Sequence, residues 1–127
     1  MKTRNPITRS PGTLSKLHAF KKASKLEDYS KQFVFDLEHE EILHETEHWV
    51  VIPNRFPYDN VFTKHNMIVP KRVFARENEM TVEELNDLEG LKDTLDAEYD
   101  GIMENLMGGR SVNKHYHLHL LRWKDRQ

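Results

Sequence analysis

The side chains with the clearest capacity for chemistry are three histidines near the C-terminus, His115, His117 and His119, in the segment HYHLHLLRW. On a β-strand, alternate side chains point to opposite faces. The spacing therefore predicts that the three imidazoles share one face, while Tyr116 and Leu118 point to the other. Because an unperturbed imidazole titrates at about pH 6.5, we expect such a cluster to exchange protons near neutrality.

Chemistry alone leaves three interpretations of this pattern open. In the first, the histidines alternate by chance on an exposed face. In the second, they bind zinc, because two or three imidazole nitrogens and a water molecule make a catalytic zinc site. In the third, one histidine is a nucleophile, and its neighbours handle phosphate charge and the proton of the leaving group.

Composition limits the classes of protein that can carry this segment. At 127 residues, with 37% hydrophobic and 31% charged residues, the chain fits one folded globular domain. The net charge of −2 provides no field that attracts nucleic acid or a membrane surface, so we expect neither as a partner. There is no cysteine, which excludes disulfides, thiolate zinc sites and a cysteine nucleophile, and which fits a cytoplasmic protein.

The N-terminal segment differs from the rest of the chain. Residues 1–27 are rich in lysine and arginine, and no acidic residue precedes Glu27. We expect a basic extension that is partly helical, because apolar residues between positions 14 and 26 have a loosely helical spacing. The main domain then covers residues 28–127. An acid-poor segment with serine and threonine also fits an organellar transit peptide, which is the alternative to a cytoplasmic location.

The elements that must position the histidines are predicted to form an α+β fold, an antiparallel sheet of about five strands with one long helix packed on it. Branched and aromatic residues predict strands over 33–37, 41–54, 65–74 (stopping near Pro70) and 114–123. The helix is predicted over 81–107. It begins with a T-x-x-E capping box at Thr81 and Glu84, and it ends at two glycines, Gly108 and Gly109.

The triad and its surroundings resemble the histidine-triad (HIT) superfamily of nucleotidyl hydrolases and transferases. The signature of this family, His-φ-His-φ-His-φ-φ, is filled here by HYHLHLL. The third histidine of the signature is His119 here, whereas the related uridylyltransferases have glutamine at this position. In this respect the sequence resembles the hydrolase branches of the family (nucleoside phosphoramidase and fragile-histidine types). The segment ILHETEHWVVIPNRFPY looks like the first core strands of the family, and HNMIVPK resembles its H-x-L-V-x-P-K segment. The resemblance covers roughly residues 33–123.

The sequence departs from the family pattern at three places. Lys64 stands where the family usually has glycine before the upstream histidine. The segment NRFPYDNVFTKH looks longer than the corresponding loop of the fragile-histidine branch. Ser111 lies four residues before His115, whereas the family more often has serine or threonine three residues before.

The resemblance implies a mechanism. His117 would be the nucleophile that attacks the α-phosphorus of a nucleotide conjugate, either a dinucleoside polyphosphate or a nucleoside phosphoramidate. Water would then hydrolyse the nucleotidyl-histidine. His119 would contact phosphate and assist the leaving group, and His115 and His65 would complete the cluster. This chemistry requires no metal and no cofactor.

The resemblance also implies three substrate-binding residues. Asn54 would bond the ribose hydroxyls, although asparagine before RFP also fits a turn. Asn105 would lie near the scissile phosphate, although it also fits a polar residue in the last turn of the long helix. Ser111 would contact phosphate, with its register shifted by one residue. Aromatic residues near the strand ends, Phe56 and Tyr58 among them, are expected in the core rather than against a base.

The expected partners are a nucleotide-containing small molecule and a second copy of the chain. The homodimer is predicted to form through the long helix and the neighbouring sheet, because a helix of that length is too long for a small sheet to cover. The alternative function, from another class, is a non-catalytic nucleotide-binding module of HIT type, and a zinc hydrolase is the third.

Overall fold

The computed structural model describes residues 8–124 and contains one antiparallel sheet of five strands. The strands are β1 (His44–Glu45), β2 (Trp49–Pro53), β3 (Phe62–Pro70), β4 (Gly101–Met103) and β5 (Leu118–Trp123), in the order β1-β2-β3-β5-β4. The predicted α+β fold is confirmed. Residues 1–7, the start of the basic segment and of any transit peptide, lie outside the described residues.

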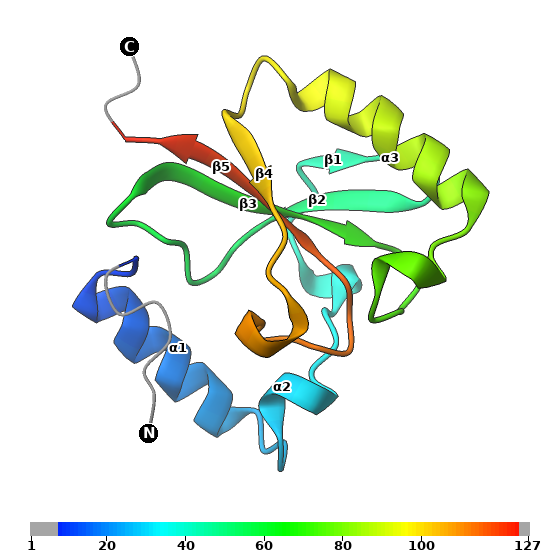
Figure 1. Cartoon of the computed structure of the whole chain (residues 1–127). Coiled ribbons are helices and arrows are strands. Elements are labelled where there is room, and N and C mark those ends of the chain that lie inside the picture. The colour runs from blue at the N-terminus through cyan, green and yellow to red at the C-terminus, as the bar shows by residue number, and fades with distance from the viewer. Residues whose placement is uncertain (1–7, 125–127) are drawn as a thin grey trace.

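Helices lie on both sides of the sheet (Figure 1). On one side is α3 (Val82–Leu95), and on the other are α1 (Pro11–Ala23) and α2 (Tyr29–Gln32). Three 3-10 turns complete the elements: η1 (Leu37–His39), η2 (Glu77–Glu79) and η3 (Met107–Gly109). None of the helices within residues 8–124 has the length and apolar character that a membrane crossing requires.

The main core lies between α3 and the sheet. Leu88, Leu91 and Leu95 of α3 are buried there. The sheet and its flanking segments contribute a set of buried apolar residues to the same core: Trp49, Val51, Ile68, Phe74, Tyr99, Tyr116, Leu118 and Leu120. The indole N–H of Trp49 donates to the Glu84 carbonyl at 2.8 Å, so the buried ring has a polar partner as well as packing. The alternation predicted for the histidine segment is confirmed on this side, because Tyr116, Leu118 and Leu120 all point into the core.

The register of β3 against β5 determines which side chains share the face of the sheet opposite α3. Met67 lies opposite His119, and His65 lies opposite Leu121. Because side chains alternate along a strand, His65 and Met67 share a face, and His119 joins them from the neighbouring strand. A second apolar cluster lies on this face and comprises Val50, Ile52, Met67 and Val69, with Phe35 and Leu37 packed against it. β3 ends at Pro70, as predicted.

The prediction of one helix over 81–107 is wrong. The helix begins as predicted, with the reciprocal capping box of Thr81 and Glu84, but α3 ends at Leu95. The chain then turns and returns along β5 as β4, with the N–H of Asp100 donating to the Leu121 carbonyl at 2.8 Å. Gly108 and Gly109 lie in the turn η3 and do not end a helix.

Three of the predicted strands are corrected as well. Residues 33–37 form no ladder, because the N–H of Phe35 donates to a ring nitrogen of His115 instead of to a strand. Residues 41–54 are a hairpin rather than one strand, and the carboxylate of Asp87 accepts from Thr46 and His48 in its turn. The last strand begins at Leu118 rather than 114, since the N–H of Tyr116 donates to Phe74 outside the ladder.

Helix α1 is fixed to the loop between β2 and β3. The carboxylate of Asp59 accepts hydrogen bonds from the backbone and hydroxyl of Ser10, at 2.8 and 2.9 Å, and from the hydroxyl of Thr13 at 2.6 Å. Burial would raise the pKa of Asp59, but the bonds from Thr13 and Ser10 outweigh it and lower the pKa to about 2. Leu17 is buried beneath the helix. The second half of the predicted extension is therefore a docked part of the protein.

Candidate active site

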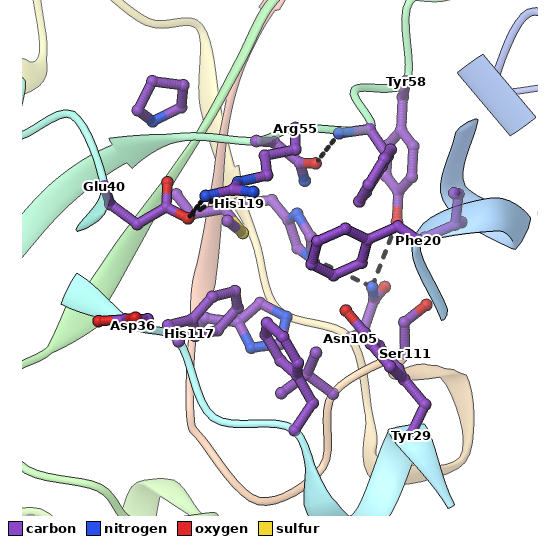
Figure 2. Close-up of a pocket in the computed structure, with 18 of the residues that line it drawn as sticks. Phe20, Tyr29, Asp36, Glu40, Arg55, Tyr58, Asn105, Ser111, His117 and His119 are labelled. Carbon is purple, nitrogen blue, oxygen red and sulfur yellow. Dashed lines mark hydrogen bonds and ion pairs between the residues drawn. The ribbon is translucent and has the colours of Figure 1, made fainter. Parts of the chain in front are cut away.

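A cavity of about 260 Å³ opens on the face of the sheet opposite α3. Figure 2 shows His117 and His119 at its centre, with Asp36, Glu40 and Arg55 on one side and Tyr58, Asn105 and Ser111 on the other. The histidines come from β5 and the segment just before it, whereas α1 and the loop after β2 supply much of the opposite wall. The site is thus assembled from segments far apart in the sequence.

His117 is held in one tautomer. Its Nδ1 lies 3.0 Å from the carbonyl oxygen of His115, which can only accept, so Nδ1 carries the proton and donates it. The lone pair is therefore on Nε2, and His117 lines the cavity. Burial lowers the pKa of His117 to about 4. A neutral imidazole with its free lone pair in a cavity has the properties of a nucleophile.

His115 supports this arrangement from behind the cavity. The backbone N–H of Phe35 donates to its Nδ1 at 3.3 Å, so the proton is on Nε2, which donates to the Pro70 carbonyl at 2.9 Å. The ring is fully buried, and burial lowers its pKa. With both nitrogens bonded to the backbone, His115 fixes the carbonyl that orients His117.

His65 and His119 form a direct pair. The N–H of Tyr58 donates to His65 Nδ1 at 2.9 Å, so His65 carries its proton on Nε2 and donates it to His119 Nδ1 at 2.6 Å. His119 must then carry its own proton on Nε2, which lies 3.3 Å from the amide group of Asn105. With Nε2 protonated, the amide oxygen rather than the amide nitrogen is the partner that satisfies this contact. The pair therefore ends in an N–H donor at the cavity wall.

The expectation that these imidazoles exchange protons near pH 6.5 is wrong. Burial lowers the pKa of His65 to about 3, and the nearby charge of Arg9 lowers it further in the same direction. Burial also holds the pKa of His119 well below its usual value. At neutral pH the cluster is uncharged, so each ring acts through a fixed tautomer rather than as a freely titrating base.

All three residues predicted to bind substrate line this cavity. Asn54 stabilises the turn after β2, since its amide oxygen accepts from the N–H of Phe56 at 2.8 Å, and its amide nitrogen lies 3.2 Å from His65. Asn105 lies in the loop after β4, not in a helical turn as one interpretation had it. Ser111 lies beside Asn105 (Figure 2). The structure thus gathers His117, His119 and these three side chains, with His65 and His115 behind them.

The sequence did not reveal the aromatic wall of the cavity. Phe20 of α1 packs against Phe56 at a centroid distance of 5.3 Å, and Tyr29 of α2 stacks on Phe33 at 4.7 Å. Phe56, expected in the core, lines the cavity instead, whereas Tyr58 is buried as expected and also lines the cavity. The helical spacing of Phe20 gave a weak signal for a buried face, but nothing in the sequence indicated which surface it would cover. Flat aromatic side chains beside a polar centre suit a planar heterocycle.

Most of the histidine ring nitrogens already make hydrogen bonds within the protein, which leaves too few of them to bind zinc. His115 uses both nitrogens on the backbone, and the pair of His65 and His119 uses one nitrogen of each ring on the other. Within residues 8–124, no group of three or more histidine, aspartate or glutamate side chains is arranged to hold a metal ion. The geometry therefore favours hydrogen bonding and nucleophilic attack over metal ligation by this cluster.

Comparison with known proteins gives matches among structures only. No protein-family model matches the chain, and no curated protein sequence matches it. A HIT family hydrolase from Legionella pneumophila Philadelphia 1 is 25% identical, with a TM-score of 0.50, over 69% of this chain and 83% of that one. A histidine triad protein from Clostridium difficile is 19% identical, with a TM-score of 0.52, over 69% of this chain and 83% of that one. A structure named Hit Like Protein is 17% identical, with a TM-score of 0.53, over 65% of this chain and 85% of that one. The resemblance noted in the sequence is thereby confirmed, and the chain has the fold of the histidine-triad proteins.

Proposed function

We propose that the protein is a nucleotidyl hydrolase or transferase that acts at the α-phosphate of a nucleotide conjugate through a covalent intermediate on His117. The observation that carries the proposal is the tautomer of this residue. Its Nδ1–H is bonded to the His115 carbonyl, which leaves the Nε2 lone pair in the cavity. Similarity to a structure named as a HIT family hydrolase supports the hydrolase class.

In the first step, His117 Nε2 attacks the α-phosphorus, and the bond from phosphorus to the leaving group breaks. The imidazole becomes positively charged when the P–N bond forms, and the His115 carbonyl, which accepts the Nδ1–H, stabilises that charge. The Nε2–H of His119, at the cavity wall, donates a hydrogen bond to the departing atom of the leaving group and stabilises the negative charge that develops there.

In the second step, water cleaves the P–N bond and releases a nucleoside monophosphate. When the P–N bond breaks, His117 departs as a neutral imidazole with its Nδ1–H still bonded to the His115 carbonyl, and the proton of the attacking water passes from the product phosphate to solvent, so the cluster returns to its starting state. The amides of Asn54 and Asn105 and the hydroxyl of Ser111 border the cavity where the ribose and the phosphate would lie. The aromatic wall of Phe20, Phe56 and their neighbours would receive the base.

The test is direct detection of the intermediate. The protein is mixed with a diadenosine polyphosphate or with adenosine 5′-phosphoramidate, quenched with acid within milliseconds to seconds, and analysed by intact-protein mass spectrometry. We expect an adenylyl adduct that peptide mapping locates on His117. The variant His117→Ala should form no adduct and lose at least about a thousandfold in turnover. His18→Ala, an exposed histidine of α1, is the matched control and should behave as wild type.

The outcomes separate the two function classes. Because His117 is buried, circular dichroism and thermal melting of His117→Ala must first show that the fold is retained. A folded variant that keeps more than a few per cent of the activity would exclude His117 as the nucleophile. Nucleotide binding by the wild-type protein with no turnover of either substrate would instead favour the non-catalytic module.

A further inference from the structure

Arg9 places a cation in the cavity wall without a direct ion pair to a carboxylate among the described residues. Arg9 lines the cavity and directs its Nε–H to the Phe56 carbonyl at 2.7 Å. No aspartate or glutamate within residues 8–124 forms an ion pair with it. Nε is bonded to the backbone, and the guanidinium also makes a side-chain hydrogen bond with Tyr58. A guanidinium carries five N–H groups, so further N–H groups remain able to bind a ligand.

The other charges near the cavity are paired. Arg55 bonds Glu40 at 3.0 Å, and Asp36 lies 2.7 Å from a ring nitrogen of His39. Glu40 and Asp36 lie on the side of the cavity away from Tyr58 (Figure 2). The carboxylate of Asp59, which is near Arg9, is occupied by the hydrogen bonds that hold α1. Asp59 offsets part of the charge of Arg9 from a distance, but its carboxylate is held by α1 and makes no ion pair with the guanidinium, so Arg9 presents a cation to this side of the cavity.

The position of Arg9 links this charge to the leaving-group side of the site. Its guanidinium carbon lies 4.7 Å from the centroid of the Tyr58 ring. That ring packs on His65 and His119, with centroid distances of 4.4 and 5.7 Å. The charge of Arg9 acts on both imidazoles and lowers the pKa of each. Arg9 is thus a neighbour of the histidine that donates to the leaving group.

We propose that Arg9 recognises an anionic leaving group, a phosphate or polyphosphate beyond the α-phosphate. This inference rests on the proposed function and narrows it: the preferred substrates are nucleotide conjugates with a phosphoric anhydride bond, rather than phosphoramidates with a neutral leaving group. When His117 attacks the α-phosphorus, the departing phosphate gains negative charge, and the planar guanidinium receives it in bidentate geometry. Arg9 precedes the part of the sequence that resembles the HIT family, so this recognition is a property of this chain's own N-terminal segment.

The experiment compares two substrates that share one nucleoside. Arg9→Gln removes the charge and keeps an amide that can donate to the Phe56 carbonyl. Lys16→Gln, on the exposed side of α1, removes the same charge from the same helix and is the matched control. For diadenosine triphosphate, kcat/KM of Arg9→Gln should fall at least about tenfold. For adenosine 5′-phosphoramidate it should change less than about threefold, and Lys16→Gln should match wild type on both.

Binding of inorganic tripolyphosphate, measured by calorimetry, separates this inference from the proposed function. Arg9→Gln should bind it at least about tenfold more weakly than wild type and Lys16→Gln. Absence of turnover in the wild type would remove the proposed function, and with it the leaving-group role. Equal losses on the two substrates, or tripolyphosphate binding that is unaffected by Arg9→Gln, would overturn the assignment of Arg9. Arg9→Lys should recover part of the lost binding, because it restores the charge.

Discussion

The buried imidazoles should make the stability of the protein depend on pH in a range where carboxylates do not titrate. Burial lowers the pKa of His65 to about 3 and of His117 to about 4 in the folded protein. In the unfolded chain both titrate at about 6.5. The unfolded state therefore binds more protons below neutrality, and the free energy of unfolding falls as the pH falls.

The size of the effect follows from linkage. Between pH 7.5 and 5.5, a histidine that remains neutral when folded and has an unfolded pKa of about 6.5 loses between about 1 and 2 kcal/mol of stability. His65 and His117 together should cost about 3 kcal/mol over this interval. His115 and His119 should also reduce the free energy of unfolding as the pH falls, because burial lowers the pKa of each. The loss is a large fraction of the roughly 5–15 kcal/mol that stabilises a typical domain.

The measurement is urea unfolding followed by circular dichroism at pH 8.5, 7.5, 6.5 and 5.5, with linear extrapolation to water. The interval from 8.5 to 7.5 is an internal control, because these histidines contribute almost nothing there. The variant His117→Gln lacks one of the titrating groups and should lose about 1 kcal/mol less than wild type between pH 7.5 and 5.5. A wild-type change below about 1 kcal/mol over that interval would show that the imidazoles are not held neutral by burial.

Three further predictions concern the cluster and its assembly. His119→Ala should slow substrates with poor leaving groups more than those with good ones, and equal losses across a leaving-group series would remove its role in assisting the leaving group. His65→Ala should reduce kcat less than His119→Ala does, since it acts through the hydrogen bond of 2.6 Å to His119, and steady-state kinetics on one substrate decides this. We also propose a homodimer. Because α3 is only 14 residues long, we now expect the dimer interface at the edge strand β4, where Ile102 is exposed, rather than along the helix. A mass near 15.1 kDa in sedimentation at micromolar concentration would contradict the homodimer.

The alternation of histidines could be read from the sequence because a strand and an extended segment share the same period. Only His119 lies within β5, yet the faces alternate as predicted from Tyr116 onward. The protonation states could not be predicted. They depend on the N–H of Phe35, the carbonyl of Pro70 and the N–H of Tyr58, and local sequence does not reveal these long-range partners.

The error in the long helix has a physical origin. Leu95, Tyr99 and Ile102 continue a spacing of three to four residues, and this spacing cannot distinguish a helix from a helix that is followed by a turn and a short strand. Asp100 and Gly101 form a dipeptide that favours turns, and this was the available signal for a boundary. Ile102 pairs with Leu120 across the sheet rather than continuing the face of α3.

The contribution of the N-terminal segment was the least predictable part of the site. Its positive charge suggested an extension, but its docking depends on three hydrogen bonds to Asp59, which is 46 to 49 residues away in the sequence. A thin apolar stripe with one buried residue, Leu17, carries little information about its partner surface. The sequence therefore predicted the histidine cluster and left the opposite wall of the cavity undetermined.

The way α1 is held makes its docking and ligand binding interdependent. The helix buries one side chain, Leu17, and is otherwise held by hydrogen bonds to Asp59 and by the packing of Phe20 on Phe56, so we expect its detachment to cost less free energy than global unfolding. Detachment removes Arg9, Leu17 and Phe20 from the cavity wall, so a ligand that touches them binds the docked form better. By thermodynamic linkage, such a ligand slows hydrogen exchange throughout α1. A substitution that loosens the helix weakens ligand binding by the factor by which it reduces the docked fraction. We therefore expect the docked helix to lengthen the residence time of a ligand that touches it.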